Sequence, residues 1–172
     1  DLQTSALVGS TFVVDNAGSA ITQGVEMDVR YAVTDNLTVG ASGSYLDAYY
    51  DDFDNAACTV RQAYEARLAN IRPCVQDLTD EPLQYAPDWA GNLNLEWFTA
   101  ITDKLEIKVR ADANYSASYY TAQDEDPYTK ADSYTRLNLR IALAEHNGDW
   151  ELALVGKNLT DKRYETASQV VG

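Results

Sequence analysis

Charged side chains of both signs stand at alternate positions in 106–112, and two arginines follow the same alternation at 136 and 140. Residues two apart on a β-strand point to the same side, so each group would form one ionic face. Such a face could line the path of a polar ligand, and the structural alternative is that these charges pair with one another. The residues concerned are Glu106, Lys108, Arg110, Asp112, Arg136 and Arg140.

Catalytic chemistry is not indicated anywhere in the sequence. His146 is the only histidine, and no nucleophile–base pair or phosphate-binding glycine loop accompanies it. The absence of these groups argues against a catalytic triad and against an enzyme. We therefore expect no catalytic residue and no cofactor.

The charge balance limits the partners of the chain. The 172 residues include 13 basic and 27 acidic ones, which gives a net charge of -14. Nucleic acid is excluded as a partner, because no basic surface is present to displace phosphate counterions. The acidic excess is typical of solvated loops, and the alternative is a surface for cations or a cationic ligand.

The two cysteines, Cys58 and Cys74, lie in one polar stretch. A disulfide that closes a loop of about 15 residues stabilises a fold by about 3 kcal/mol. We favour such a disulfide, which implies an oxidising compartment, over two free thiols in a cytosolic protein.

A metal site is not expected in that stretch or elsewhere. Zinc would need more ligands than two cysteines without a CxxC spacing and a single histidine provide. Asp51, Asp52 and Asp54 suggest calcium, but the full EF-hand pattern is absent. We interpret them as a solvated acidic loop tip.

The same long connection, residues 50–84, carries aromatic and arginine side chains that often anchor ligands. The candidates for contact with a ligand are Tyr50, Arg61, Tyr64 and Arg67. Packing of these residues around the disulfide is an equally good interpretation. A short helix within 61–71 is the only helical pattern in the sequence.

The remaining sequence alternates between apolar and polar residues with a period of two, which predicts β-strands. In the longest case every odd position from Leu105 to Tyr119 is apolar or aromatic, and the even positions between them are polar. The predicted strands are 25–33, 37–45, 89–97, 105–119, 137–143 and 150–154, with one more ending near Leu7.

Short and long connections alternate strictly between these strands. Residues 34–36, 99–103 and 145–149 form tight turns, and the last contains the hairpin signal Asn147-Gly148. Residues 50–84 and 121–132 form long links. All short turns therefore fall on one rim of the sheet, and all long loops on the other.

Three features favour a membrane-spanning barrel over a soluble β-sandwich with the same alternation. The longest strands have roughly 10 to 15 residues, about the length that crosses a bilayer when tilted. The rims are asymmetric, as in outer-membrane barrels. Large aromatic residues lie toward strand ends on the apolar side, as in the girdles of such barrels; they are Tyr45, Tyr49, Trp89, Trp97, Tyr115 and Tyr119.

The sequence predicts an all-β fold, an antiparallel transmembrane barrel segment of about seven strands that spans residues 1–172. An open edge in lipid would leave backbone groups unpaired, so such strands must close into a barrel. Barrel strands usually come in even numbers. The chain also begins at Asp1 without a signal sequence and ends at Val171-Gly172 as if in mid-protein. We therefore expect an internal fragment of a longer protein.

Three motifs resemble those of TonB-dependent outer-membrane receptors. Residues 23–28, QGVEMD, resemble the "GVE" run that opens a barrel strand, and residues 85–89, YAPDW, resemble the "aP-x-W" start of a later strand. Residues 156–164, GKNLTDKRY, resemble the "NL-x-D-K-x-Y" motif, which is the most specific of the three. Their order and spacing agree with the family over nearly the whole chain.

This resemblance implies a location in the outer membrane of Gram-negative bacteria, with lipid around the barrel. The strands would be roughly the 15th to 21st of about 22, around a plug domain with which the charged residues could also pair. The long loop 50–84 would face the outside and the short turns the periplasm. The TonB complex would power import of a scarce small-molecule ligand, of the siderophore, cobalamin or oligosaccharide class.

The sequence departs from a complete family member in three respects. No plug domain, no TonB box and no final strand with a terminal aromatic residue occur in it. Energy coupling is thus implied by the resemblance alone. Two alternatives stay open: a passive porin or adhesin barrel, and a secreted soluble β-sandwich that binds sugar.

Overall fold

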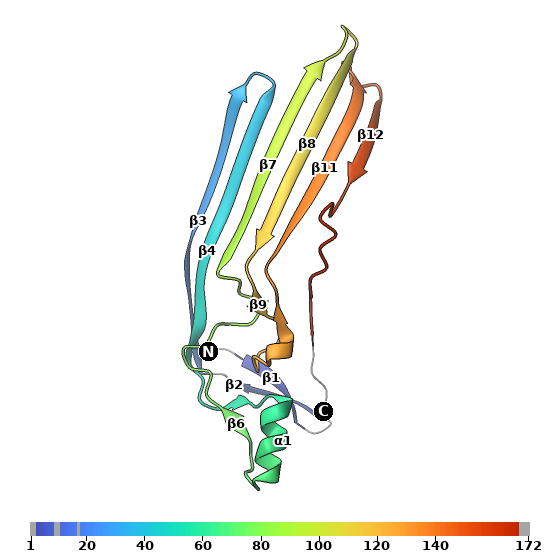
Figure 1. Ribbon diagram of the computed structural model, residues 1–172. Coiled ribbons are helices and arrows are strands. Elements are labelled where there is room, and N and C mark those ends of the chain that lie inside the picture. Colours follow the sequence, from blue (N-terminus) through green and yellow to red (C-terminus); the bar gives the residue numbers. More distant parts are fainter. Residues whose placement is uncertain (1–2, 9–10, 17, 169–172) are drawn as a thin grey trace.

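The computed structural model describes residues 3–8, 11–16 and 18–168, and its main feature is one antiparallel sheet of six strands (Figure 1). The spatial order is β12-β11-β8-β7-β4-β3, so each long strand pairs with the next long strand along the chain. This meander is the order found in up-and-down barrels. The strands are β3 (Ser19–Thr34), β4 (Leu37–Asp52), β7 (Trp89–Ala100), β8 (Leu105–Ser116), β11 (Tyr134–Glu145) and β12 (Glu151–Gly156).

The predicted fold class, an antiparallel barrel segment, is confirmed, and the sheet is open at both edges within the described residues. The strand expected to end near Leu7 does form, as β1 (Gln3–Val8). It pairs with β2 (Thr11–Asn16) in a separate hairpin instead of joining the long sheet. Pairing with the nearest segment closes the shortest loop and costs the least chain entropy. The long sheet therefore has six strands, where about seven were expected.

The register between strands collects the alternating apolar residues on one side of the sheet, the apolar face. One row across its middle joins Val29, Ala41, Leu93, Ala113 and Leu137. The apolar residues of this face have odd numbers in the first five strands and even numbers in β12, because Leu143 lies opposite Leu152. The six strands thus agree on a single apolar side, as a sheet between two different media requires.

No second sheet covers the apolar face in the part of the chain that the structure describes. Leu93 is 63% exposed and Leu154 is 76% exposed. A β-sandwich would bury such residues between its two sheets. The sugar-binding β-sandwich is therefore not the architecture of this chain.

Aromatic residues do lie near the ends of this face. Tyr45 and Trp89 are register partners whose ring centroids are 4.8 Å apart, and Trp97 lies toward the opposite end of β7. Two of the expected girdle residues lie closer to the long connections. Tyr49 is beyond the β4–β7 pairing, and Tyr119 belongs to β9, because the strand predicted for 105–119 ends at Ser116.

The two rims differ as predicted. The tight turns after β3, β7 and β11 lie at the top of Figure 1, and the long connections lie at the bottom. In the last turn, Gly148 has φ of 81°, which glycine adopts without strain, and its N–H donates to the carbonyl of Glu145.

The long connections contain short elements of their own. After β4 these are β5 (Ala56–Ala57), α1 (Val60–Leu68) and β6 (Val75–Gln76), and after β8 they are β9 (Tyr119–Tyr120), η1 (Pro127–Thr129) and β10 (Lys130–Ala131). The predicted helix is confirmed as α1, and a capping box between Thr59 and Gln62 fixes its first turn. Among the described residues, no helix is both long and apolar enough to cross a membrane.

The cluster of buried hydrophobic residues lies at the end of β4 and among these connections. It consists of Tyr50, Phe53, Ala56 and Leu78, with Leu83 packed against them. We call this group the loop core. Tyr50 is 1% exposed, so the end of β4 supplies the central side chain of the loops.

The glycine of the QGVEMD motif has a steric role. A Cβ at Gly24 would lie 2.3 Å from the carbonyl oxygen of Tyr45 on the neighbouring strand. Any other residue would force the two backbones apart. This contact gives a physical reason for glycine at the position where the motif has it.

Candidate functional site

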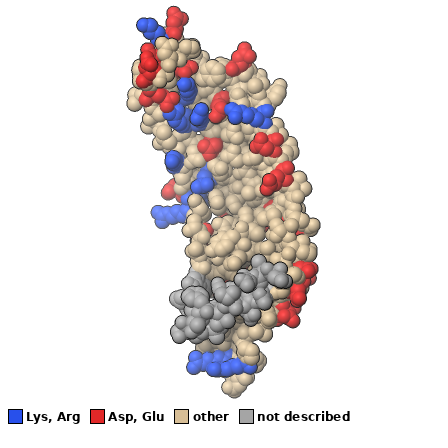
Figure 2. Space-filling model, turned by 180° about the vertical axis from the view of Figure 1, so that it is seen from behind, with Lys and Arg blue, Asp and Glu red and all other residues tan. Residues whose placement is uncertain are grey.

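The polar residues of the six strands gather on the side of the sheet opposite the apolar face, which we call the polar face. One row across it joins Asp28, Ser42, Asn92, Asn114 and Arg136. Seen from behind, basic and acidic side chains are interspersed over the upper part of the long sheet (Figure 2). All six charged residues predicted to share a face are brought together here, on β8 and β11.

Near the short turns these charges pair within the sheet. Glu96 lies between Arg30 and Arg110, with nitrogen–oxygen distances of 2.9 and 3.5 Å. Lys108 lies 2.8 Å from Glu106, and Arg140 pairs with Glu151. Arg110 and Arg140 lie directly opposite each other on β8 and β11, and both are positively charged. Each therefore pairs with a carboxylate on the next strand away from the other arginine. This end of the polar face favours the pairing alternative over contact with a ligand.

In the middle of the polar face, amides and one carboxylate form a chain of hydrogen bonds. Asn94 donates to Asn92 at 3.0 Å, and Asn92 donates to the Oδ1 of Asn114 at 3.0 Å. Asn114 and Asn138 each donate to the Oδ2 of Asp112 at 2.7 Å. Asp112 is therefore held by two amides from β8 and β11, and this chain fixes the side chains across three strands.

The segment after β12 runs along the edge of β11 and joins this chain (Figure 1). The N–H of Asn158 donates to the Oδ1 of Asn138 at 2.9 Å, and the N–H of Leu159 donates to the carbonyl of Leu137 at 2.8 Å. The side chain of Asn158 also accepts from the N–H of Lys162. The GKNLTDKRY motif thus encodes a locally capped turn that is bound to the polar face.

Near the long connections, tyrosine rings hold an arginine in place. The rings of Tyr134 and Tyr164 stack with centroids 4.5 Å apart. The guanidinium of Arg136 lies over both rings, at 5.9 and 5.2 Å, and donates to the hydroxyl of Tyr164 at 3.2 Å. Stacking on aromatic faces leaves guanidinium donors available for a planar acceptor.

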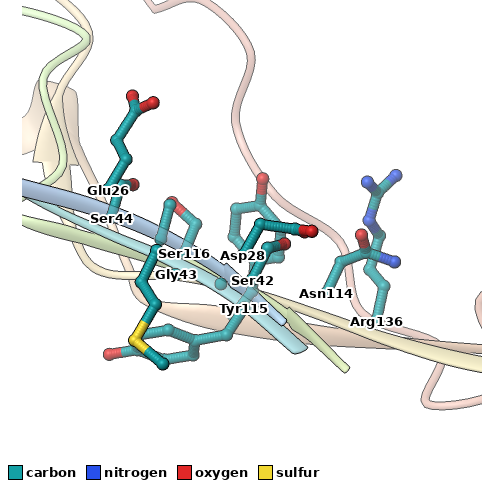
Figure 3. Close-up of a pocket in the computed structure, with 13 residues that line it drawn as sticks. Glu26, Asp28, Ser42, Gly43, Ser44, Asn114, Tyr115, Ser116 and Arg136 are labelled. Atoms are coloured by element: carbon teal, nitrogen blue, oxygen red, sulfur yellow. The ribbon is translucent and has the colours of Figure 1, made fainter. Parts of the chain in front are cut away.

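Beside this arginine the polar face is hollowed. The hollow has a volume of about 650 Å³, within the range of ligand sites. Small side chains, among them Ser42, Ser44 and Ser116, form its floor. Glu26 and Arg136 project from the same side of the sheet at opposite ends of the hollow, and the ring of Tyr115 lies on the other side (Figure 3).

Of the residues around the hollow, Arg136 is predicted from the sequence as a site residue, and the others are not. Glu26, Asp28 and Asn114 carry the same alternation as the charged residues that were named. Extending the period-two pattern through every strand would have found them. Their proximity to Arg136 depends on the register of five strands, which the pattern alone does not give.

The candidate mouth residues of the long connection are not brought to the polar face. Tyr50 is buried in the loop core, which fits the packing alternative and removes it from contact with a ligand. Arg61, Tyr64 and Arg67 lie on α1, at the end of the molecule farthest from the short turns (Figure 1). Tyr64 is exposed, and Arg61 pairs with Glu65 on the helix surface. Ligand contact by these three residues stays a prediction.

The predicted disulfide is present, with the Cα atoms of Cys58 and Cys74 5.8 Å apart. It encloses α1, of which no residue is buried. A helix of nine residues without packing is marginal in water, so the disulfide and the capping box hold it.

Replacing both cysteines with serine is therefore expected to free residues 59–73, with a loss of about 3 kcal/mol of local stability by chain-entropy arguments. Hydrogen exchange measures this as faster exchange of the α1 amides, while the β7 and β8 amides keep their protection. Mass spectrometry with and without reductant is the control for the disulfide itself. Unchanged protection of α1 in the double variant would contradict the role assigned to the disulfide.

The acidic residues considered for calcium do not form a metal site in the described ranges. No group of three or more potential ligands comes together there. Asp51 instead accepts from the hydroxyl of Ser19 at 2.9 Å, and Asp54 is exposed.

The two long connections pack against each other through polar contacts. Gln76 donates to the carbonyl of Asp124 at 2.9 Å, and the N–H of Tyr85 donates to the carbonyl of Tyr120 at 2.8 Å. At this junction Glu125 lies beside Glu81. Burial, followed by the neighbouring Glu81 charge, raises the pKa of Glu125 to about 7.

The packing of the connections is expected to weaken as the pH rises from about 4.5 to about 7. The raised pKa means that the packed state disfavours the ionised carboxyl, so stability is complete below the ordinary value and falls until Glu125 is ionised. Burial also raises the pKa of Asp124, so its ionisation weakens the packing in the same way. The positive charge of Lys130 lowers the pKa of Glu125 and so acts against the effect of burial. The amide protection of Tyr85, corrected for intrinsic exchange, should be higher at pH 5 than at pH 8. Glu125→Gln should reduce that difference, and equal protection at both pH values in the unaltered protein would refute the mechanism.

Comparison with known proteins adds one finding. Residues 1–159 match the model of the family described as "TonB dependent receptor-like, beta-barrel". No solved structure matches the chain.

Proposed function

Because the chain belongs to the TonB dependent receptor-like β-barrel family, a family of outer-membrane receptors for TonB-linked transport, we propose that it forms part of the wall of such a receptor. In this proposal the apolar face contacts lipid and the polar face lines the interior of the barrel. The observation that carries it is the register, which sorts six strands into one apolar and one polar side. Members of the family transport ligands and are not enzymes.

The open sheet supports the presence of further strands in the complete barrel. Lipid offers no partner for the free backbone groups of an edge strand. We propose that residues 1–172 are a partial barrel, and that the final strand and the plug domain belong to other parts of the receptor. The TonB complex would act through that plug.

The difference between the two rims supports one orientation of the sheet in the membrane. Barrels of this kind carry short turns on the periplasmic side and long loops outside. We propose that residues 50–84 face the outside of a Gram-negative cell, where an oxidising environment maintains the disulfide. Arg61, Tyr64 and Arg67 would then be available to a ligand at the outer mouth.

The imported ligand is proposed to be a small or medium-sized nutrient of the siderophore, cobalamin or oligosaccharide class. The two long connections, residues 53–88 and 117–133, contain ten acidic and four basic residues. Their field disfavours a strongly anionic ligand at the mouth.

Uptake measurements on three strains test the proposal. The strains are the parent, one that lacks this receptor and one that lacks TonB, each supplied with a labelled ferric siderophore, cobalamin or maltopentaose. We expect uptake of one ligand to fall equally in both mutants. Loss of uptake in the receptor mutant alone would favour the passive porin, and unchanged uptake of every labelled nutrient would contradict the three proposed ligand classes.

A further inference from the structure

The charges that flank the hollow differ from those near the short turns in lacking oppositely charged partners. Near the turns, the arginines and glutamates of the polar face form ion pairs. In the described part of the chain, Glu26, Asp28 and Arg136 take part in none. The Nε of Arg136 is buried and has no hydrogen-bond partner there.

Opposite charges occupy opposite ends of the hollow because four strand intervals separate them. Asp28 is on β3, and Arg136 follows in the same row after β4, β7 and β8. At about 4.8 Å per interval, the two backbones are about 19 Å apart along the sheet. This separation prevents the two groups from neutralising each other.

Between the charged ends, the row offers both donors and acceptors. Ser42 contributes a hydroxyl, and Asn114 contributes an amide whose orientation is fixed by Asn92 and Asp112. Such groups match the N–H and C=O groups of an extended backbone.

We propose that the hollow binds a zwitterionic, peptide-like ligand, with its ammonium group at Glu26 and Asp28 and its carboxylate at Arg136. This inference rests on the proposed function, transport along the same polar face, and replaces the ligand classes named there with a peptide-like one. An anionic ligand would be repelled at the β3 end, a cationic one at the β11 end, and a neutral sugar would leave both charged ends unpaired. An extended peptide of about five residues spans roughly 17 Å, which matches the row.

Binding of penta-alanine to the complete receptor in detergent, measured by calorimetry, tests the proposal. The probe is compared with its N-acetylated form, its C-amidated form and maltopentaose. Removing either terminal charge should weaken binding by about tenfold or more, since each charge-assisted contact contributes that much. Binding that does not depend on the terminal charges, no binding of penta-alanine, or tighter binding of maltopentaose would overturn the proposal.

Variants separate recognition from folding. Arg136→Gln should remove the preference for a free C-terminus and keep the preference for a free N-terminus, and Arg136→Lys should restore part of the first. Asp28→Asn should weaken the preference for a free N-terminus and keep the preference for a free C-terminus. Arg110→Gln, on the same face but paired with Glu96, is the matched control and should change neither. TonB-linked uptake of a different ligand, together with failure of the peptide tests, would refute this inference while the proposed function stands.

Discussion

Replacing Leu93 with arginine is expected to destabilise the folded receptor in lipid by about 2–4 kcal/mol, the cost of a cation on the lipid side of a barrel near the bilayer midplane. Leu93 lies in the middle of the apolar face, with Ala41 and Ala113 as its neighbours in the row. These small neighbours offer no carboxylate to pair with the new charge. The measurement is urea unfolding of the complete receptor in phospholipid vesicles, followed by tryptophan fluorescence.

The matched control is Ser42→Arg, which adds the same side chain to the opposite side of the sheet. Ser42 lies opposite Asp28, so an arginine there gains a carboxylate and stays outside lipid. We expect its free energy of unfolding to change by less than about 1 kcal/mol. A reversed order, with Ser42→Arg the more damaging of the two, would mean that the faces have been assigned to the wrong media.

Replacing Tyr50 with alanine is expected to cost about 3–5 kcal/mol of the stability of the long connections, as for other large buried rings. Tyr50 is 1% exposed, and its ring centroid lies 5.0 Å from that of Phe53. Its backbone also binds the connection, since its N–H donates to the carbonyl of Glu81 and its carbonyl accepts from Asp80. Without the ring, the loop core loses its centre while the long sheet keeps its own hydrogen bonds.

Limited proteolysis combined with hydrogen exchange measures this local effect. The Tyr50→Ala variant should be cleaved within 53–88 and 117–133 while the strands stay protected. Tyr50→Phe keeps the ring and should remain close to the unaltered protein. Equal resistance of Tyr50→Ala and the unaltered protein would show that the loops are held by other contacts.

The sequence predicts the two-sided sheet well because period two is a local property. The alternation from Leu105 onward assigns Lys108 and Arg110 to one side without any knowledge of neighbours, and the structure agrees. The limits of strands are harder to predict. The pattern continues to Tyr119, but Tyr119 pairs with Ala131 in the loops and leaves the sheet. Local sequence does not determine that choice between two partners.

The site depends on contacts between distant strands, and these could not be predicted. The sequence makes Tyr50 a candidate for contact with a ligand, yet Phe53, Leu78 and Leu83 pack around it in the loop core. Glu26 and Arg136 are more than a hundred positions apart, and only the register of five strands places them around one hollow. A slip of one residue in any strand would reverse its faces, so alternation without register leaves such a site undefined.

The assignment of lipid to one side and an enclosed interior to the other is tested most directly by spin labels on adjacent residues. Single cysteines at Leu93, Val109, Asn92 and Lys108 of the complete receptor, with the Cys58–Cys74 disulfide intact, would be labelled and reconstituted in vesicles. Labels at Leu93 and Val109 should collide with dissolved oxygen, which concentrates in lipid, and labels at Asn92 and Lys108 should not. Preferential collision of the Leu93 and Val109 labels with a water-soluble nickel chelate would contradict the account.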